Sequence, residues 1–101
     1  MAAYLMSLCK ITNPHDNFKK YVKISGDMLK EYGGTYVVRG PADSVYEGDY
    51  LNGPVVIIAQ FESMDKLKGF VESDAYQKDV KPLRDGSGIY DVACYEEAPQ
   101  T

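Results

Sequence analysis

The order of apolar and polar positions divides the chain into four strand-like runs and two helical segments. Apolar and β-branched residues fill the four short runs Tyr4–Ile11, Thr35–Arg39, Val55–Phe61 and Ile89–Tyr95, whose lengths suit β-strands. The two longer segments repeat apolar residues at helical spacing. Their apolar stripes are formed by Phe18, Tyr21, Val22, Met28, Leu29 and Tyr32, and by Met64, Leu67, Phe70 and Val71. The pattern therefore predicts the order β-α-β-β-α-β.

Capping and breaking residues predict where these elements begin and end. Asn13 is suited to the N-cap of the first helix, with Pro14 at the first helical position. Ser63 is the predicted N-cap of the second helix. Gly40-Pro41 interrupts the second strand, and Val45–Glu47 is a candidate for its continuation after a bend.

This order predicts an α+β, ferredoxin-like fold: a four-stranded antiparallel sheet with two helices on one face. We expect residues 1–101 to form a single domain, because domains of about 100–150 residues are typical. The first and last strands should be antiparallel neighbours. Cys9 and Cys94 should then lie near opposite ends of that pair, too far apart for a disulfide, and both are expected to be small buried hydrophobes.

The third strand is apolar at both alternating sets of positions. Val55, Ile57 and Ala59 fall on one face, and Val56 and Ile58 on the other. Two helices cover one face only, so a monomer would expose an apolar patch that soluble proteins rarely tolerate. We expect a homodimer in which two sheets pack face to face and close an α/β barrel. The alternative is that the loop 40–54 and the C-terminal tail partly cover the second face.

Charge and length exclude several classes of partner. Fifteen acidic and eleven basic residues give a net charge of −4, which argues against nucleic acid. No run approaches the roughly 20 apolar residues that cross a bilayer, and the apolar N-terminus lacks the basic start of a secretion signal. We therefore expect a cytoplasmic protein without a membrane partner. One histidine and two distant cysteines do not form a zinc pattern, and no nucleotide-binding glycine motif occurs, so neither a metal nor another cofactor is expected.

Several short motifs, in order along nearly the whole chain, resemble those of the bacterial family called domain of unknown function 1330. They are Ala3-Tyr4, Gly33-Gly34, Arg39-Gly40 with Glu47-Gly48-Asp49-Tyr50, Val55–Ser63, Ser73–Gln77 and Leu83-Arg84. The resemblance implies a dimeric α/β barrel. Barrels of this kind include cofactor-free monooxygenases, polyketide cyclases, haem-degrading enzymes and muconolactone isomerases, a kinship of fold that says little about function. Tyr50 stands where the family usually has Trp, and Gly53-Pro54 where it usually has Arg.

Candidate site residues gather around the end of the second strand. Arg39 could hold a carboxylate or an enolate with both of its terminal nitrogens. Its alternative role is an ion pair with Glu47 or Asp49. Glu47 lies beside aromatic surface, which could raise its pKa and make it an acid or base. Asp49 and Tyr50 are candidate ligand contacts, the alternative being turn formation around Gly48.

Two further side chains are candidates for proton transfer. Asp91 interrupts an apolar strand, so it is either a pocket acid or exposed at an edge. His15 is either a general base at the barrel mouth or a solvated surface residue. The tyrosines on strands or in the nearby loop are candidate ligand contacts or interface residues: Tyr36, Tyr46, Tyr50, Tyr90 and Tyr95. Tyr21 is expected to pack on the helix, and Arg84 to anchor the loop before the last strand.

Three functional hypotheses follow. The first is a dimeric protein that binds a small polar organic molecule, as a cofactor-free isomerase or cyclase would, with Arg39 holding the anion and Glu47, Asp91 or His15 moving the proton. The second is a non-enzymatic structural or regulatory dimer whose barrel is filled by its own side chains. The third is a monooxygenase, either cofactor-free or linked to haem.

Overall fold

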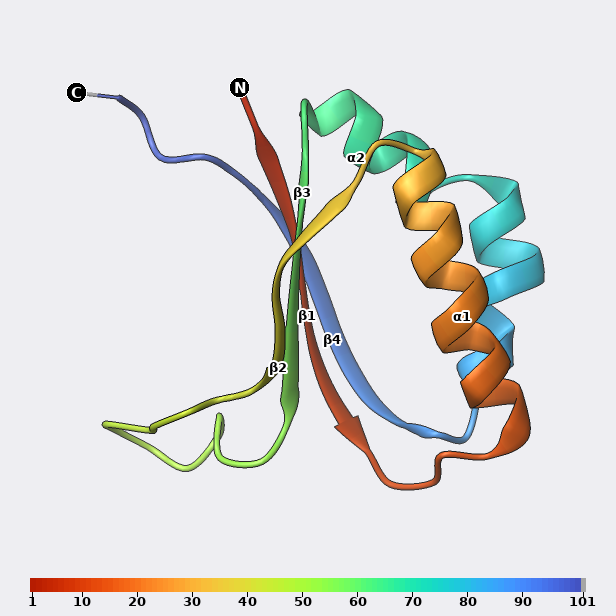
Figure 1. Cartoon of the computed structure of the whole chain (residues 1–101), viewed down its shortest axis with the longest axis vertical. Coiled ribbons are helices and arrows are strands. Elements are labelled where there is room, and N and C mark those ends of the chain that lie inside the picture. Colours follow the sequence, from red (N-terminus) through yellow and green to blue (C-terminus); the bar gives the residue numbers. More distant parts are fainter. Residues whose placement is uncertain (101) are drawn as a thin grey trace.

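A four-stranded antiparallel sheet carries all the helical segments on one face in the computed structural model, which describes residues 1–100 (Figure 1). The elements follow the predicted order, with two irregular helical segments, η1 and η2, before the last strand. They are β1 (Ala3–Ile11), α1 (Asp16–Glu31), β2 (Thr35–Pro41), β3 (Val55–Phe61), α2 (Met64–Val71), the π-helical η1 (Ala75–Val80), the 3-10 turn η2 (Lys81–Arg84) and β4 (Gly88–Glu96). The predicted ferredoxin-like fold is confirmed.

The strand order β2-β3-β1-β4 makes β1 and β3 the inner strands. β1 and β4 are antiparallel neighbours, as predicted. Cys9 pairs with Tyr90 and Cys94 with Leu5, so the cysteines are offset along the strand pair, and both are free thiols. Cys9 is buried, but the prediction that Cys94 is also buried is wrong for the single chain. β4 is an edge strand, and Cys94 is exposed there.

The N-cap of α1 is His15, so the predictions of Asn13 as cap and Pro14 as first helical residue are wrong. The backbone N–H of Asn13 donates to the Ser87 carbonyl at 2.9 Å, which ties this segment to the turn before β4. The helix can begin only after that attachment. His15 then has an extended backbone, and its Nδ1 accepts from the N–H of Phe18. At α2, the predicted cap is confirmed: Ser63 Oγ accepts from the N–H of Lys66 at 3.2 Å.

The hydrophobic core lies between the sheet and the helices, at the end of the sheet where β1 begins and β3 ends. Its fully buried side chains include Phe61 and Leu67, and Phe70 stacks on Phe61 with ring centroids 6.0 Å apart. Leu29 of α1 closes the same cluster. Because β1 pairs Ala3 with Phe61, the core is concentrated at one end of the helix-covered face.

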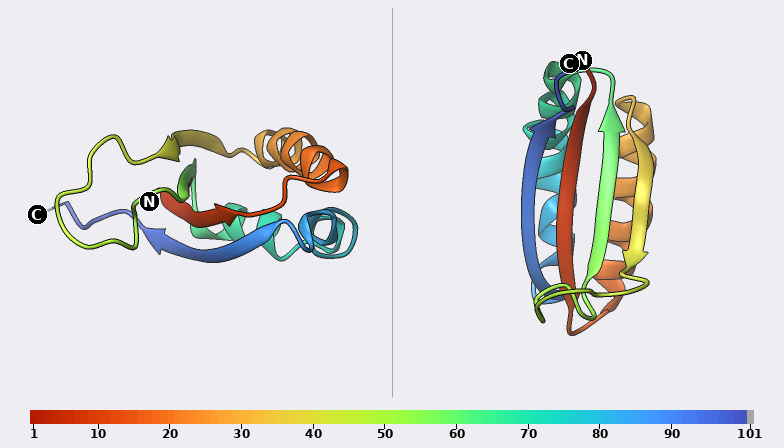
Figure 2. Two further views of the ribbon diagram at one scale, coloured as in Figure 1. Left: turned by 90° about the horizontal axis from the view of Figure 1, so that it is seen from below. Right: turned by 90° about the vertical axis from the view of Figure 1, so that its left-hand side faces the viewer.

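The other face of the sheet carries Met6, Leu8, Val56 and Ile58, which pair across β1 and β3. The loop 42–54 runs across the lower end of this face (Figure 2). Leu8 is only 8% exposed there. The loop thus partly covers this sheet face in the single chain, which was the alternative to cover by a second chain.

The suggestion that β2 resumes at Val45–Glu47 is wrong, because these residues belong to the loop 42–54. Tyr46 is 93% exposed. Pro41 ends the strand pairing, opposite Val55, and it has no N–H with which to extend it. Apolar residues alone therefore did not make this segment a strand.

Candidate functional site

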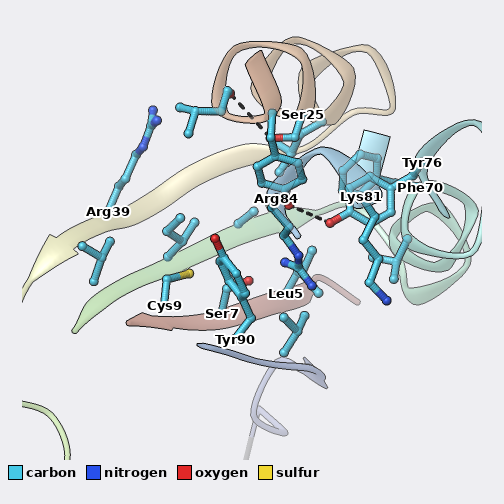
Figure 3. Close-up of a pocket in the computed structure, with 18 of the residues that line it drawn as sticks. Leu5, Ser7, Cys9, Ser25, Arg39, Phe70, Tyr76, Lys81, Arg84 and Tyr90 are labelled. Carbon is cyan, nitrogen blue, oxygen red and sulfur yellow. Dashed lines mark hydrogen bonds between the residues drawn. The ribbon is translucent and has the colours of Figure 1, made fainter. Parts of the chain in front are cut away.

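A partly open cavity of about 350 Å3 lies between the sheet and the helices, beside the hydrophobic core (Figure 3). Ser7 and Cys9 of β1 and Ile57 of β3 form part of its floor, and Phe18 and Tyr21 of α1 part of its opposite wall. This volume lies within the range of small-molecule sites, about 300–1,000 Å3. The cavity is therefore large enough for an organic ligand.

The cavity results from small side chains on the helix-facing side of β1. Ser7 and Cys9 follow Leu5 on this face, whereas the core end of the same face is filled by Phe61 and Leu5. A serine and a cysteine are too short to meet the helices across the layer. The core is close-packed where the side chains are large and hollow where they are small.

Arg84 contributes a cation to this cavity. Its guanidinium carbon lies 4.1 Å from the ring centroid of Tyr90 and 5.6 Å from that of Tyr21. Such stacking on ring faces attracts the guanidinium and limits its rotation. The fully buried Ser87 lies beside this arrangement: its hydroxyl donates to the Arg84 carbonyl and also hydrogen-bonds to the Tyr90 hydroxyl. The turn before β4 thus positions both the cation and the ring that supports it.

A pair of phenols forms a second polar feature of the wall. The hydroxyls of Tyr21 and Tyr76 are 2.7 Å apart. Burial raises the pKa of Tyr21 well above its ordinary value, and the nearby Tyr76 raises it further, while Arg84 opposes the shift. Tyr21 therefore keeps its proton at neutral pH. The pair can donate a hydrogen bond to a ligand, but Tyr21 is a poor general base.

The charged residues that line the cavity all have the same sign. They are Arg39, Lys81 and Arg84, and no aspartate or glutamate among residues 1–100 lines it. None of the ion pairs formed within residues 1–100 involves these three side chains. Burial also raises the pKa of the Cys9 thiol, partly offset by Arg84, so this thiol adds no negative charge. In a chain of net charge −4, the cavity is therefore a local concentration of positive charge.

Two of the predicted site residues, Arg39 and Tyr36, line this cavity. They lie on β2, and the guanidinium carbon of Arg39 is 4.8 Å from the ring centroid of Tyr36. Arg39 is exposed at the edge of the sheet. The alternative ion pair with Glu47 or Asp49 is not among those formed by residues 1–100.

Asp91 and Tyr50 lie together on the opposite face of the sheet. The Tyr50 hydroxyl donates to an Asp91 carboxylate oxygen at 3.2 Å, and this bond raises the pKa of the Tyr50 phenol. Glu47 and Asp49 are exposed in the same loop, and none of these four residues lines the cavity. The structure therefore separates them from Arg39, with which the sequence had grouped them.

His15 is also outside the cavity. Its Nδ1 accepts from the N–H of Phe18 at 3.0 Å, and its Nε2 is 2.7 Å from the carbonyl oxygen of Asp85, to which it can only donate. Both ring nitrogens are thus engaged by the backbone, with the proton on Nε2. This arrangement joins the start of α1 to the turn that follows Arg84.

The sequence pattern did not identify Arg84 or Tyr76 as cavity residues, and it favoured packing for Tyr21. Tyr90, a candidate for ligand contact or interface packing, does line the cavity. Arg84 follows two irregular helical turns, so no periodic pattern places its side chain. One signal was available: Ser7 and Cys9 share a face of β1 with Leu5 and interrupt its large apolar side chains. Two small residues in a row on a covered face indicate a hollow above them.

Residues 1–100 lack two further kinds of feature. No group of three or more His, Cys, Asp and Glu side chains is arranged to hold a metal ion. No helix in this part of the chain is both long and apolar enough to span a membrane.

Comparison with known proteins gives a family and a fold. Residues 2–98 match the family described as Domain of unknown function (DUF1330). No curated protein matches the sequence. Among solved structures, RPA0582 of Rhodopseudomonas palustris, a protein of unknown function, has a TM-score of 0.71 at 15% identity, covering 98% of this chain and 84% of its own. SnoaB of Streptomyces nogalater, a cofactor-independent oxygenase solved as a mutant, has a TM-score of 0.63 at 13% identity, covering 99% and 95%.

Proposed function

Since the chain belongs to the DUF1330 family, whose name states no function, we propose its function from the cavity: it binds a small, largely apolar organic anion. One observation carries the proposal. Arg84 lines the cavity, stacked against Tyr90 and Tyr21, and no acidic side chain in the described part of the chain lines the same cavity to neutralise it. A carboxylate or an enolate is the anion that a guanidinium with covered faces recognises best, through the donors along its edge.

The two phenols can also stabilise negative charge that develops on a bound ligand. A neutral Tyr21–Tyr76 pair can donate to an oxyanion, and Arg84 can neutralise it, so the cavity would stabilise the ionised form of a weakly acidic ligand. Within residues 1–100, no carboxylate or imidazole side chain lines the cavity as a base. The proposed role is therefore to bind and stabilise an anion, and proton transfer by Glu47, Asp91 or His15 is not part of it.

A second candidate function is cofactor-independent oxygenation. The fold resemblance to SnoaB, which covers nearly all of both chains, favours it. An enolate or phenolate is electron-rich, and an ionised substrate of this kind can pass electrons to O2 directly. A cavity that stabilises such an anion supplies the first requirement of that reaction. Oxygen uptake with an added enolisable aromatic ketone, followed with an oxygen electrode, distinguishes this function from binding alone.

Calorimetric titration with biphenyl monocarboxylate tests the binding proposal. We expect Arg84→Gln to weaken binding by about tenfold or more, since a hydrogen bond to a charged group contributes about 1.5–3 kcal/mol. Arg84→Lys keeps the charge but loses the fork of donors, so its affinity should lie between the two. Lys68→Gln is the matched control, because it removes an exposed positive charge that does not line the cavity.

The readouts separate a ligand contact from a structural role. Circular dichroism and urea unfolding show whether each Arg84 variant is folded. A folded Arg84→Gln variant that binds the probe as tightly as the unmodified protein would refute the proposal. So would an unmodified protein that binds neither this monocarboxylate nor its phenolate analogue.

We also propose that two chains associate through the sheet face opposite the helices. Met6, Val56 and Ile58 form an apolar group on this face, and the loop 42–54 crosses only one end of it. A second sheet packed on this group would remove it from water.

A further inference from the structure

The chain has only two arginines, and both line the same cavity. Arg39 projects from β2, and Arg84 lies over Tyr90 of β4. Since the strand order is β2-β3-β1-β4, these strands are the two edges of the sheet. Figure 3 shows Arg39 on one side of the cavity and Arg84 with Tyr90 across it.

Strand pairing fixes the distance between the two arginine-bearing ends of the cavity. Arg39 pairs with Ile57, which pairs with Ser7, so these three residues form one row across the sheet. In β4 the row continues at Val92, and Tyr90, two residues along the strand, pairs with Cys9. Three strand spacings of about 4.8 Å separate the backbones of the two edge strands by about 14 Å. Both arginine side chains are long enough to shorten this span by reaching inward.

Each arginine is supported in the same way. The guanidinium carbon of Arg39 lies 4.8 Å from the ring centroid of Tyr36, and that of Arg84 lies 4.1 Å from the ring centroid of Tyr90. In both cases a tyrosine ring takes one face of the guanidinium, and its edge donors are available for an anion. No ion pair within residues 1–100 uses either arginine. The floor between them carries the neutral side chains of Ser7 and Cys9.

We infer that the cavity takes an elongated organic dianion, such as an aromatic dicarboxylate, with one carboxylate at Arg84 and the other at Arg39. This inference rests on the proposed function for the Arg84 end and adds a second anionic end to the ligand. Arg84 is the deeper, partly buried anchor. Arg39 is exposed, so water and salt screen its contact, and its contribution is the smaller of the two.

The test compares matched acids that differ only in the second carboxylate. Biphenyl dicarboxylate, with a carboxylate at each far end, is titrated beside biphenyl monocarboxylate, and terephthalate beside benzoate. We expect the longer diacid to bind about three- to fivefold tighter than its monoacid, as an exposed ion pair of up to about 1 kcal/mol allows. For the single-ring pair the ratio should be near one, because terephthalate is too short to reach both edges.

Substitution of Arg39 then identifies the second contact. Arg39→Gln should remove most of the advantage of the diacid, with a much smaller effect on the monoacid, which Arg39 attracts only through the general positive charge of the cavity. Lys68→Gln, which removes an exposed charge away from the cavity, should leave the ratio intact. Raising the salt concentration should shrink the advantage of the diacid in the unmodified protein.

The outcomes separate this inference from the proposed function. Equal binding of the biphenyl diacid and monoacid, both dependent on Arg84, would overturn the dianion and leave the anion site standing. A diacid advantage that survives Arg39→Gln would also overturn it. Failure of every acid to bind, with no effect of Arg84→Gln, would refute the proposed function itself.

Discussion

Gly34 lies where the chain returns from α1 to the sheet, and the absence of a side chain lets the backbone pass close to the core. A Cβ at this position would lie 2.6 Å from Leu29 Cδ2 and 2.8 Å from Phe61 Cζ. Both neighbours belong to the buried core, so neither can move without repacking it.

We expect Gly34→Ala to destabilise the protein by about 1–3 kcal/mol, the usual cost of overpacking. Gly69→Ala is the matched control: a Cβ there meets nothing within 4 Å, and alanine in a helix should stabilise by about 0.5–1 kcal/mol. Urea unfolding of the two variants gives both values. Equal stability of the two variants would show that the Gly34 contact yields more easily than its geometry indicates.

Tyr21 makes the stability of the folded protein depend on pH in the alkaline range. Burial raises its pKa above the ordinary value of 10, with Tyr76 adding to the shift. Just above pH 10 the unfolded chain has released this proton and the folded chain has kept it. The unfolded state then binds fewer protons, so the free energy of unfolding decreases as pH rises through this window and is unaffected below it.

We expect Tyr21→Phe to flatten part of this decrease, while at neutral pH it costs about 0.5–1.5 kcal/mol for the lost hydrogen bond to Tyr76. The measurement is urea unfolding at several pH values on either side of 10. Tyr46→Phe is the control, because its side chain is 93% exposed and its replacement should leave stability unchanged. An unchanged slope in Tyr21→Phe would show that other groups cause the decrease.

Among the elements, α1 shows how a cap can link distant parts of the chain. His15 closes the first turn of α1 through Nδ1 and contacts the Asp85 carbonyl through Nε2. The same turn leads from Arg84 to Ser87, so the start of the helix and Arg84 share a support.

Loss of this cap should be measurable in urea. We expect His15→Ala to destabilise by about 0.5–2 kcal/mol, and His15→Asn to recover part of this, because asparagine can also accept from the N–H of the first turn. Asn13→Ala should change stability by less than about 0.5 kcal/mol, since its side chain forms no hydrogen bond with residues 1–100. A larger effect at Asn13 than at His15 would contradict the assignment of the cap.

The same helix shows what local sequence could and could not predict. The helix itself was predictable, because its apolar stripe repeats over 16 residues. Its start was not, because the bonds from Thr12 and Asn13 to Ser87 join residues 75 and 74 positions apart, and only the folded sheet brings them together. The prediction of a strand at Val45–Glu47 was wrong for a related reason: strand-forming residues become a strand only where a neighbouring strand edge is available for pairing.

At the scale of the whole molecule, the order of helices and strands was enough to predict the pairing of the first and last strands and the covering of one sheet face by helices. It was not enough to predict the cavity. Arg39 and Tyr36 were identifiable because they lie on a regular strand. Arg84 contacts Tyr90 and Tyr21 only because the irregular segments η1 and η2 and the pairing of β4 with β1 bring them together. A cavity between layers depends on side-chain lengths in several elements at once, which no single stretch of sequence contains.

The proposed dimer has a direct measurement. Sedimentation equilibrium of the unmodified protein should give twice the mass of the chain, and Val38→Lys on the face opposite the helices should shift it toward the monomer. Val38 is already 45% exposed in the single chain, so this variant should fold. Ile24→Lys, at an exposed position of α1, is the control and should not change the mass. A monomeric unmodified protein at high concentration would exclude the dimer.

The start of β1 and the end of β4 lie side by side, and this has a mechanical consequence. The N–H of Glu97 donates to the Ala2 carbonyl at 3.0 Å, where the antiparallel strands β1 and β4 meet at one end (Figure 2). A force that pulls Ala2 and Glu97 apart acts along the hydrogen bonds between β1 and β4, because these bonds lie across the strands. It would therefore break the hydrogen-bonded pairs one after another. In single-molecule stretching we expect a lower rupture force with handles at Ala2 and Glu97 than with handles at Ala2 and Asp85. The second geometry pulls along the strands and loads all the hydrogen-bonded pairs in shear at once.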